Sequence, residues 1–144
     1  AGIDSSGVDW TKVIRRGVLK KESPKGFMGH HSFQKRYFAL ESNGTKSRLV
    51  YWKSEAEKSK APSGIIRVMN IVQIKPFKDN KGSVFVMVHC KGDGKGTSEK
   101  ARSPRAYVLQ GLDDKETAAW IKELGNLLHT LVLQHKSHVT GGSI

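Results

Sequence analysis

Seven short runs rich in β-branched and aromatic residues constrain the fold of this chain more than any other feature of its sequence. They occupy residues 13–22, 33–41, 48–53, 64–69, 72–77, 84–90 and 106–110. Turn chemistry separates them, with Ser42-Asn43-Gly44 after the second run and Asp-Asn-Lys-Gly at residues 79–82 after the fifth. The order predicts seven strands in an antiparallel meander. Residues 91–105 hold three glycines and one proline and predict a long loop.

The last part of the chain changes from a strand period to a helix period. Asp113 is suited to cap a helix, with Glu116 as its capping-box partner. An apolar stripe follows at spacings of three and four, formed by Trp120, Leu124, Leu127, Leu128 and Leu131. We therefore expect a mainly β fold, in which one C-terminal helix through about residue 133 caps a seven-stranded antiparallel barrel or orthogonal sandwich.

The length of 144 residues fits one domain with a single core. We expect an N-terminal extension at residues 1–12, the domain at 13–133 and a flexible tail at 134–144. No run approaches the roughly 18 apolar residues of a membrane span, and the first residues do not resemble a secretory signal. The single cysteine, Cys90, favours a reducing compartment, so a cytoplasmic location is expected.

The charge balance predicts an anionic partner. Twenty-five Lys and Arg face thirteen Asp and Glu, which gives a formal net charge of +12. No RNA-recognition signature or basic helix face favours nucleic acid, and no nucleophile and base form an enzymatic motif. Two adjacent histidines, His30 and His31, do not make a metal site. We expect a monomeric, non-enzymatic protein without metal or cofactor.

Three segments together resemble the pleckstrin homology (PH) domain family over about residues 13–133. Residues 17–21 (GVLKK) resemble its first strand, residues 35–40 (KRYFAL) its second, and residues 116–124 (ETAAWIKEL) its closing helix. Residues 63–66 (SGII) resemble the turn into its fourth strand. The resemblance implies a seven-stranded barrel closed by a helix, usually without catalysis, that binds phosphoinositides or other anionic lipids and sometimes proteins.

Strand alternation predicts a basic pocket at one mouth of the barrel. If Phe38 faces the core, Arg36 shares its face nearer the beginning of the strand. Lys21 follows the inward-facing Leu19 by two residues and reaches the same mouth from the first strand. The Tyr51 hydroxyl completes a set of donors suited to a phosphate. A solvated basic face is the alternative.

The family holds its ligand with a Lys, a gap, a further cation, one residue and an Arg. Lys21 and Arg36 match the first and last positions, but Gln34 stands where the middle cation is usual. Lys25 in the loop, or Lys35 beside Gln34, is predicted to compensate. We therefore expect modest headgroup specificity, for a phosphoinositide or for phosphatidic acid.

The tip of the loop after the first strand carries two apolar residues, Phe27 and Met28, between glycines. Such side chains are suited to insertion among lipids, and packing of Phe27 back onto the barrel is the alternative. With this loop and the incomplete cation set, the chain is also similar to acylated PH proteins of apicomplexan parasites that sense phosphatidic acid. The predicted function is peripheral attachment to the cytosolic face of an anionic membrane, and a protein-interaction module on the same scaffold is the alternative.

Overall fold

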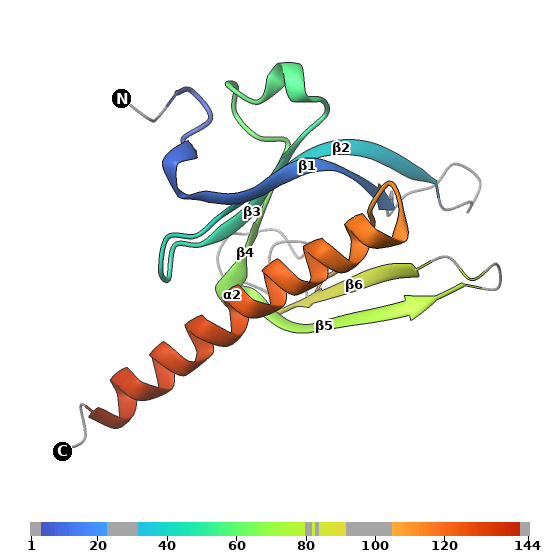
Figure 1. Ribbon diagram of the computed structural model, residues 1–144. Coiled ribbons are helices and arrows are strands. Elements are labelled where there is room, and N and C mark those ends of the chain that lie inside the picture. The colour runs from blue at the N-terminus through green and yellow to red at the C-terminus, as the bar shows by residue number, and fades with distance from the viewer. Residues whose placement is uncertain (1–3, 23–31, 80–81, 83, 92–104, 142–144) are drawn as a thin grey trace.

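The computed structural model describes residues 4–22, 32–79, 82, 84–91 and 105–141, with the side chains of the last helix described as far as residue 134. Within these residues, seven strands, three short 3-10 helices and one α-helix follow one another (Figure 1). The strands are β1 (Val13–Glu22), β2 (Phe33–Glu41), β3 (Arg48–Trp52), β4 (Gly64–Arg67), β5 (Ile71–Lys78), β6 (Val84–Cys90) and β7 (Arg105–Gln110). The 3-10 helices are η1 (Trp10–Lys12), η3 (Glu55–Glu57) and η4 (Val68–Asn70), and the α-helix is α2 (Asp114–Gly141).

The strands form one antiparallel sheet in the order β4-β3-β2-β1-β7-β6-β5. β1 pairs with β2 along its length but with β7 only through Lys20 and Lys21. This short junction joins two halves of the sheet, and α2 runs across them in Figure 1. The predicted mainly β, seven-stranded fold with one closing helix is confirmed.

The main core lies between the inner face of the sheet and α2. Alternate residues of the strands supply it, because side chains on one face recur with period two. Trp120 of α2 is 3% exposed and meets Phe38 of β2 edge-on, with ring centroids 6.5 Å apart. The predicted helix stripe is confirmed as core, since Trp120, Leu124, Leu127 and Leu131 are buried and Leu128 packs against them half-buried.

A second apolar cluster covers the outer face of β2 and β3. It contains Tyr37 and Trp52 from these strands and Val8 from the chain that precedes β1. The Trp10 ring stacks on Trp52 with centroids 5.6 Å apart. Residues 4–12, which we call the arm, are therefore packed against the sheet, although their small polar residues gave no sign of this contact in the sequence.

The structure differs most from the sequence expectations at two elements, whereas β3, β5 and β7 differ by one residue at one or both ends. The run expected to form a strand at residues 64–69 turns into η4 at Val68, so β4 ends at Arg67. The helix continues to Gly141 instead of ending near residue 133, and it takes up most of the expected tail.

The predicted helix cap is half correct. The Asp113 carboxylate accepts a hydrogen bond from the Glu116 backbone N–H at 2.7 Å, as an N-cap does. The Glu116 carboxylate, however, accepts from the Arg15 guanidinium at 2.9 Å. It therefore joins α2 to β1 instead of completing the expected capping box.

Candidate functional site

The register of β1 and β2 positions two cations at one end of the barrel. Leu19 lies opposite Arg36, and Lys21 lies opposite Gln34. Because Leu19 is a core residue on the inner face of β1, Lys21 lies on the same face two residues nearer the end of the strand. We call this end, where β1 ends and β2 begins, the mouth.

Two tyrosines surround the Lys21 side chain. Its Nζ lies 5.4 Å from the centroid of the Tyr51 ring and 5.8 Å from that of the Tyr107 ring. Tyr51 belongs to β3 and Tyr107 to β7, so the mouth draws on both halves of the sheet. Tyr51 lies against Gly64 of β4, where any Cβ would overlap its ring, so the glycine leaves room for this tyrosine.

Arg105, the first residue of β7, is a third cation of the mouth. Its guanidinium carbon lies 4.8 Å from the centroid of the Tyr107 ring. Its positive charge, with that of Arg36, acts on both Lys21 and Tyr51. Sequence reasoning missed Arg105 and Tyr107. Alternation from the buried Leu109 puts both on the inner face of β7, which is a signal that the sequence contained.

The electrostatics of the mouth favour an anion. Burial lowers the pKa of Lys21, and the nearby Arg105 and Arg36 lower it further. Burial raises the pKa of the Tyr51 phenol, while the same two arginines oppose that rise. Among the described residues, Lys21, Arg36 and Arg105 form no ion pair. A ligand with negative charge would therefore relieve repulsion among three cations.

The Arg36 guanidinium is held by its own strand. One nitrogen donates to the Lys35 carbonyl at 2.9 Å, and the other donates to the Gln34 side-chain oxygen. Gln34, at the position where the family usually has a cation, thus orients Arg36 and adds no charge of its own.

Lys35 is not brought to this group. It lies opposite Lys20 on the outer face of the hairpin, the face that also carries Tyr37. The structure therefore places Lys21, Arg36 and Tyr51 together and Lys35 on the other face of the strand. The remaining predicted residues, Lys25, Phe27 and Met28, lie outside the described residues.

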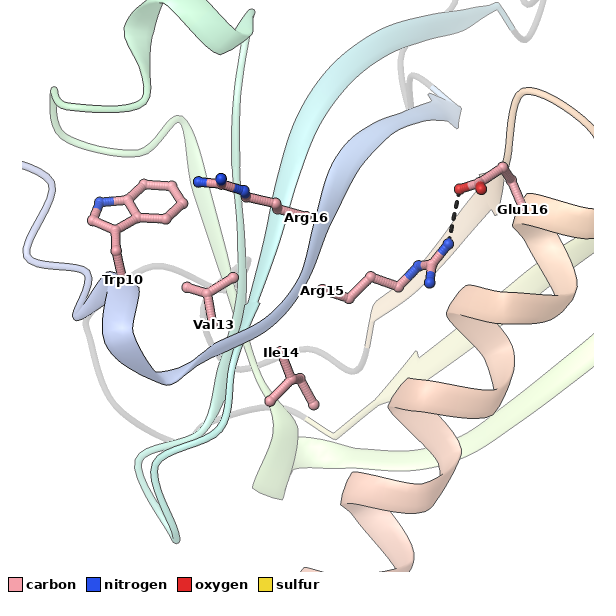
Figure 2. Close-up of a pocket in the computed structure, with 6 residues that line it drawn as sticks. All are labelled: Trp10, Val13, Ile14, Arg15, Arg16 and Glu116. Atoms are coloured by element: carbon pink, nitrogen blue, oxygen red, sulfur yellow. Dashed lines mark hydrogen bonds and ion pairs between the residues drawn. The ribbon is translucent and has the colours of Figure 1, made fainter.

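A pocket of about 530 Å³ lies along β1, away from the mouth (Figure 2). Arg15 and Arg16 extend from opposite sides of the strand in this view. Arg15 forms an ion pair with Glu116, and Arg16 lies over the Trp10 ring at 6.0 Å. Both cations already have partners within the protein, so this pocket is a weaker anion site than the mouth.

The described residues show little sign of other chemistry. Cys90 is buried, and burial raises the pKa of its thiol, which disfavours the nucleophilic thiolate. The described residues also contain no group of His, Cys, Asp and Glu arranged to hold a metal ion. Within the same part of the chain, no helix has the length and apolar character needed to cross a bilayer.

Comparison with known structures gives similar folds at low identity. The PH domain of Slm1, in complex with inositol 4-phosphate, is 18% identical, with a TM-score of 0.58 over 81% of this chain and 96% of that one. The PH domain of human KIAA0053 protein is 21% identical, with a TM-score of 0.60 over 82% and 90%. The PH domain of human oxysterol-binding protein-related protein 11 is 20% identical, with a TM-score of 0.56 over 81% and 80%.

No curated protein matches the chain significantly. The sequence model of the PH domain family matches residues 13–129, which is well over half of the chain. This match covers all seven strands and most of α2. PH domains are generally non-catalytic modules, and they commonly attach to membranes peripherally. The chain belongs to the PH domain family.

Proposed function

We propose that this PH domain is a non-enzymatic membrane-targeting module whose mouth binds the phosphate of an anionic phospholipid. The observation that carries the proposal is the convergence of Lys21, Arg36 and Arg105 from three strands on two tyrosines. Charged donors form the strongest hydrogen bonds to phosphate oxygens, and a half-buried position strengthens their attraction.

The two phenols support the same ligand. Burial is the largest influence on the pKa of Tyr51 and of Tyr107, and it raises both. Each phenol thus keeps its proton at neutral pH and can donate a hydrogen bond to a phosphate.

A phosphate monoester is the chemistry shared by the two candidate headgroups, a phosphoinositide and phosphatidic acid. The complex of the Slm1 PH domain with inositol 4-phosphate supports the first as a class of headgroup. It does not support the mouth as the position of the headgroup, because ligand binding in the Slm1 domain is described at a non-canonical site. The neutral Gln34 beside Arg36 supports a ligand with one concentrated phosphate over a ring with several. In this proposal Phe27 and Met28 insert into the cytosolic face of the membrane beside the bound headgroup, and the other cations of this +12 chain add diffuse attraction.

Sedimentation with vesicles tests the proposal. The vesicles contain phosphatidic acid, phosphatidylinositol 4-phosphate or phosphatidylserine at equal total charge. We expect the wild type to sediment with the first two more than with phosphatidylserine. Lys21→Glu combined with Arg36→Glu should abolish this preference, because reversal removes two donors and repels phosphate.

The matched control combines Lys115→Glu with Lys122→Glu, at two exposed lysines of α2. It changes the net charge by the same amount as the substitutions at the mouth. This control should keep the preference for phosphate monoesters. Equal binding to all three vesicles would show diffuse attraction without a headgroup pocket. A wild type that binds none of them would reject the membrane function and leave the protein-interaction module as the function of the fold.

A further inference from the structure

A second basic pocket lies at the other end of the barrel from the mouth. Its volume is about 450 Å³, and its walls come from the arm, the β2–β3 turn and β4. Its lining includes the cations Lys12, Lys46, Arg48 and Arg67, the acids Asp9 and Glu41, and the apolar Ile65. In Figure 1 the β2–β3 turn and the end of β1 at the mouth lie at opposite ends of the paired strands β1 and β2. We call this second site the distal pocket.

The floor of the distal pocket is fixed by a buried ion pair. Glu41 is 2% exposed and accepts from Arg48 Nε at 2.8 Å and from the Asp9 backbone N–H at 2.7 Å. A second Arg48 nitrogen donates to the Gly7 carbonyl at 2.6 Å. These bonds hold the arm against the barrel, so the shape of the pocket exists before any partner binds.

The rim of the pocket keeps positive charge without a partner. Lys46 and Arg67 are exposed and form no ion pair with any other described residue. Arg67 lies directly opposite Arg48 in the pairing of β3 and β4, where like charges repel. Lys12 also lines the rim, but it already has partners, because its Nζ lies 3.9 Å from an oxygen of Asp9 and donates to Asn43 Oδ1 at 3.1 Å. The rim is therefore complementary to carboxylates.

The strand beside the pocket favours an extended chain as the occupant. β4 is an edge strand, since it pairs with β3 on one side only. Ile65, which lines the pocket, is 46% exposed. An extended peptide can pair with a strand edge through its backbone while its side chains meet the rim, which a lipid headgroup cannot do. We infer that the distal pocket and the edge of β4 bind an extended acidic segment of a partner protein.

The position of the pocket lets both ligands bind together. A membrane at the mouth leaves the distal pocket directed away from the bilayer, so the partner segment is held above the membrane surface. Simultaneous binding of a membrane and a partner segment rests on the proposed function, whereas the affinity of the distal pocket for an acidic segment does not.

The probe is a fluorescein-labelled peptide of six residues in which glutamate and valine alternate. Its control peptide has glutamine in place of every glutamate. Fluorescence anisotropy at low salt measures both. We expect the acidic peptide to bind about tenfold more tightly than the neutral one. Lys46→Gln with Arg67→Gln should reduce this difference to about twofold, whereas Lys115→Gln with Lys122→Gln on α2 should preserve it.

Vesicle sedimentation of each variant separates this inference from the proposed function. The Lys46→Gln, Arg67→Gln variant should lose most of its preference for the acidic peptide but keep the preference of the wild type among vesicles, which also shows that it is folded. The Lys21→Glu, Arg36→Glu variant should keep the peptide. The inference is wrong if the wild type binds both peptides equally, if the distal substitutions leave the difference intact, or if the mouth substitutions abolish it. Failure of the wild type to bind vesicles would affect the proposed function alone.

Discussion

Lys21 is a cation of the mouth whose charged form is disfavoured both by burial and by neighbouring positive charge. Its ammonium lies near two aromatic rings and close to two arginines, and it forms no ion pair among the described residues. Burial and the neighbouring positive charges both favour its neutral form, so its pKa lies below the ordinary value of 10.5. A bound phosphate would reverse this preference by stabilising the ammonium.

Vesicle binding should therefore weaken at alkaline pH. A phosphate-bound Lys21 is charged, so its contribution to affinity is fully present below the lowered pKa of the free protein and is lost as the pH rises from there through the higher pKa of the phosphate-bound state. Lys21→Arg should keep its binding at a higher pH than the wild type, because arginine remains charged. Sedimentation at a series of alkaline pH values, with the wild type and Lys21→Arg compared on identical vesicles, measures the effect. Coincident profiles would show that Lys21 does not contact the headgroup.

Arg105 should be as important as Arg36. Its guanidinium lies over Tyr107 and acts on Lys21, so Arg105→Gln should weaken binding to phosphatidic acid vesicles by about tenfold. Lys122→Gln removes one exposed charge from α2 and should change binding by less than about twofold. Equal losses in the two variants would indicate that only total charge matters.

Alternation within strands predicted where Lys21 and Arg36 would lie, because the inner face of β1 and β2 is marked by core residues such as Phe38. The same alternation did not identify Arg105 as a residue of the mouth, because Arg105 adjoins a glycine-rich stretch and was assigned to the loop at residues 91–105. Lys35 is adjacent to Arg36 in the sequence, but successive residues of a strand point to opposite faces of the sheet. Lys35 therefore lies on the outer face of β2, away from the mouth.

At the scale of elements, the junction between β7 and α2 is closely fitted. Thr117 is buried, and its hydroxyl accepts from the Gly111 N–H at 2.8 Å and donates to the Asp113 carbonyl at 3.0 Å. A Cβ at Gly111 would lie 2.5 Å from the Thr117 nitrogen, so the turn requires glycine. The Asp113 cap completes the junction by satisfying one free N–H of the first turn of α2.

Removal of the cap should destabilise the domain measurably. Asp113→Ala leaves the Glu116 N–H without its side-chain acceptor and should cost about 0.5–2 kcal/mol of unfolding free energy. Asp113→Asn keeps an acceptor at the same place and should cost less. Urea unfolding of the three proteins measures the difference. A stability of Asp113→Ala equal to that of the wild type would show that water replaces the cap.

Element boundaries were predictable where turn chemistry is strong. Three strands, β1, β2 and β6, begin and end at the predicted residues. The arm was not foreseen, because its attachment depends on Trp10 meeting Trp52 and on Asp9 meeting the buried Glu41, and such long-range contacts leave no local period. The extent of α2 was underestimated because its apolar stripe ends before the helix does.

At the scale of the whole molecule, α2 holds the two halves of the sheet together. It contacts β5 and β6 on one side of the β1–β7 junction and β1 on the other. The buried side chains of the helix thus replace the strand pairing that this junction lacks. The arrangement leaves the mouth and the distal pocket at opposite ends of one rigid scaffold.

Trp120 should be the most sensitive residue of this scaffold. Trp120→Ala removes a ring that meets Phe38 and the Arg15 guanidinium, and it should cost about 3–5 kcal/mol. Leu133→Ala, on the same helix but 53% exposed, should change stability by less than about 0.5 kcal/mol. Thermal and urea unfolding measure both. A small loss for Trp120→Ala would mean that the sheet closes without the helix.

The stacked pair of Trp10 and Trp52 makes the arm visible to spectroscopy. Two indoles at 5.6 Å couple their excited states, and such coupling gives a paired positive and negative band in circular dichroism that an isolated indole lacks. The band depends on one ring from the arm and one from β3, so it disappears if the arm lifts from the sheet. The native chain thus has a built-in optical reporter, without any added label, that can be recorded while a membrane is added at the mouth.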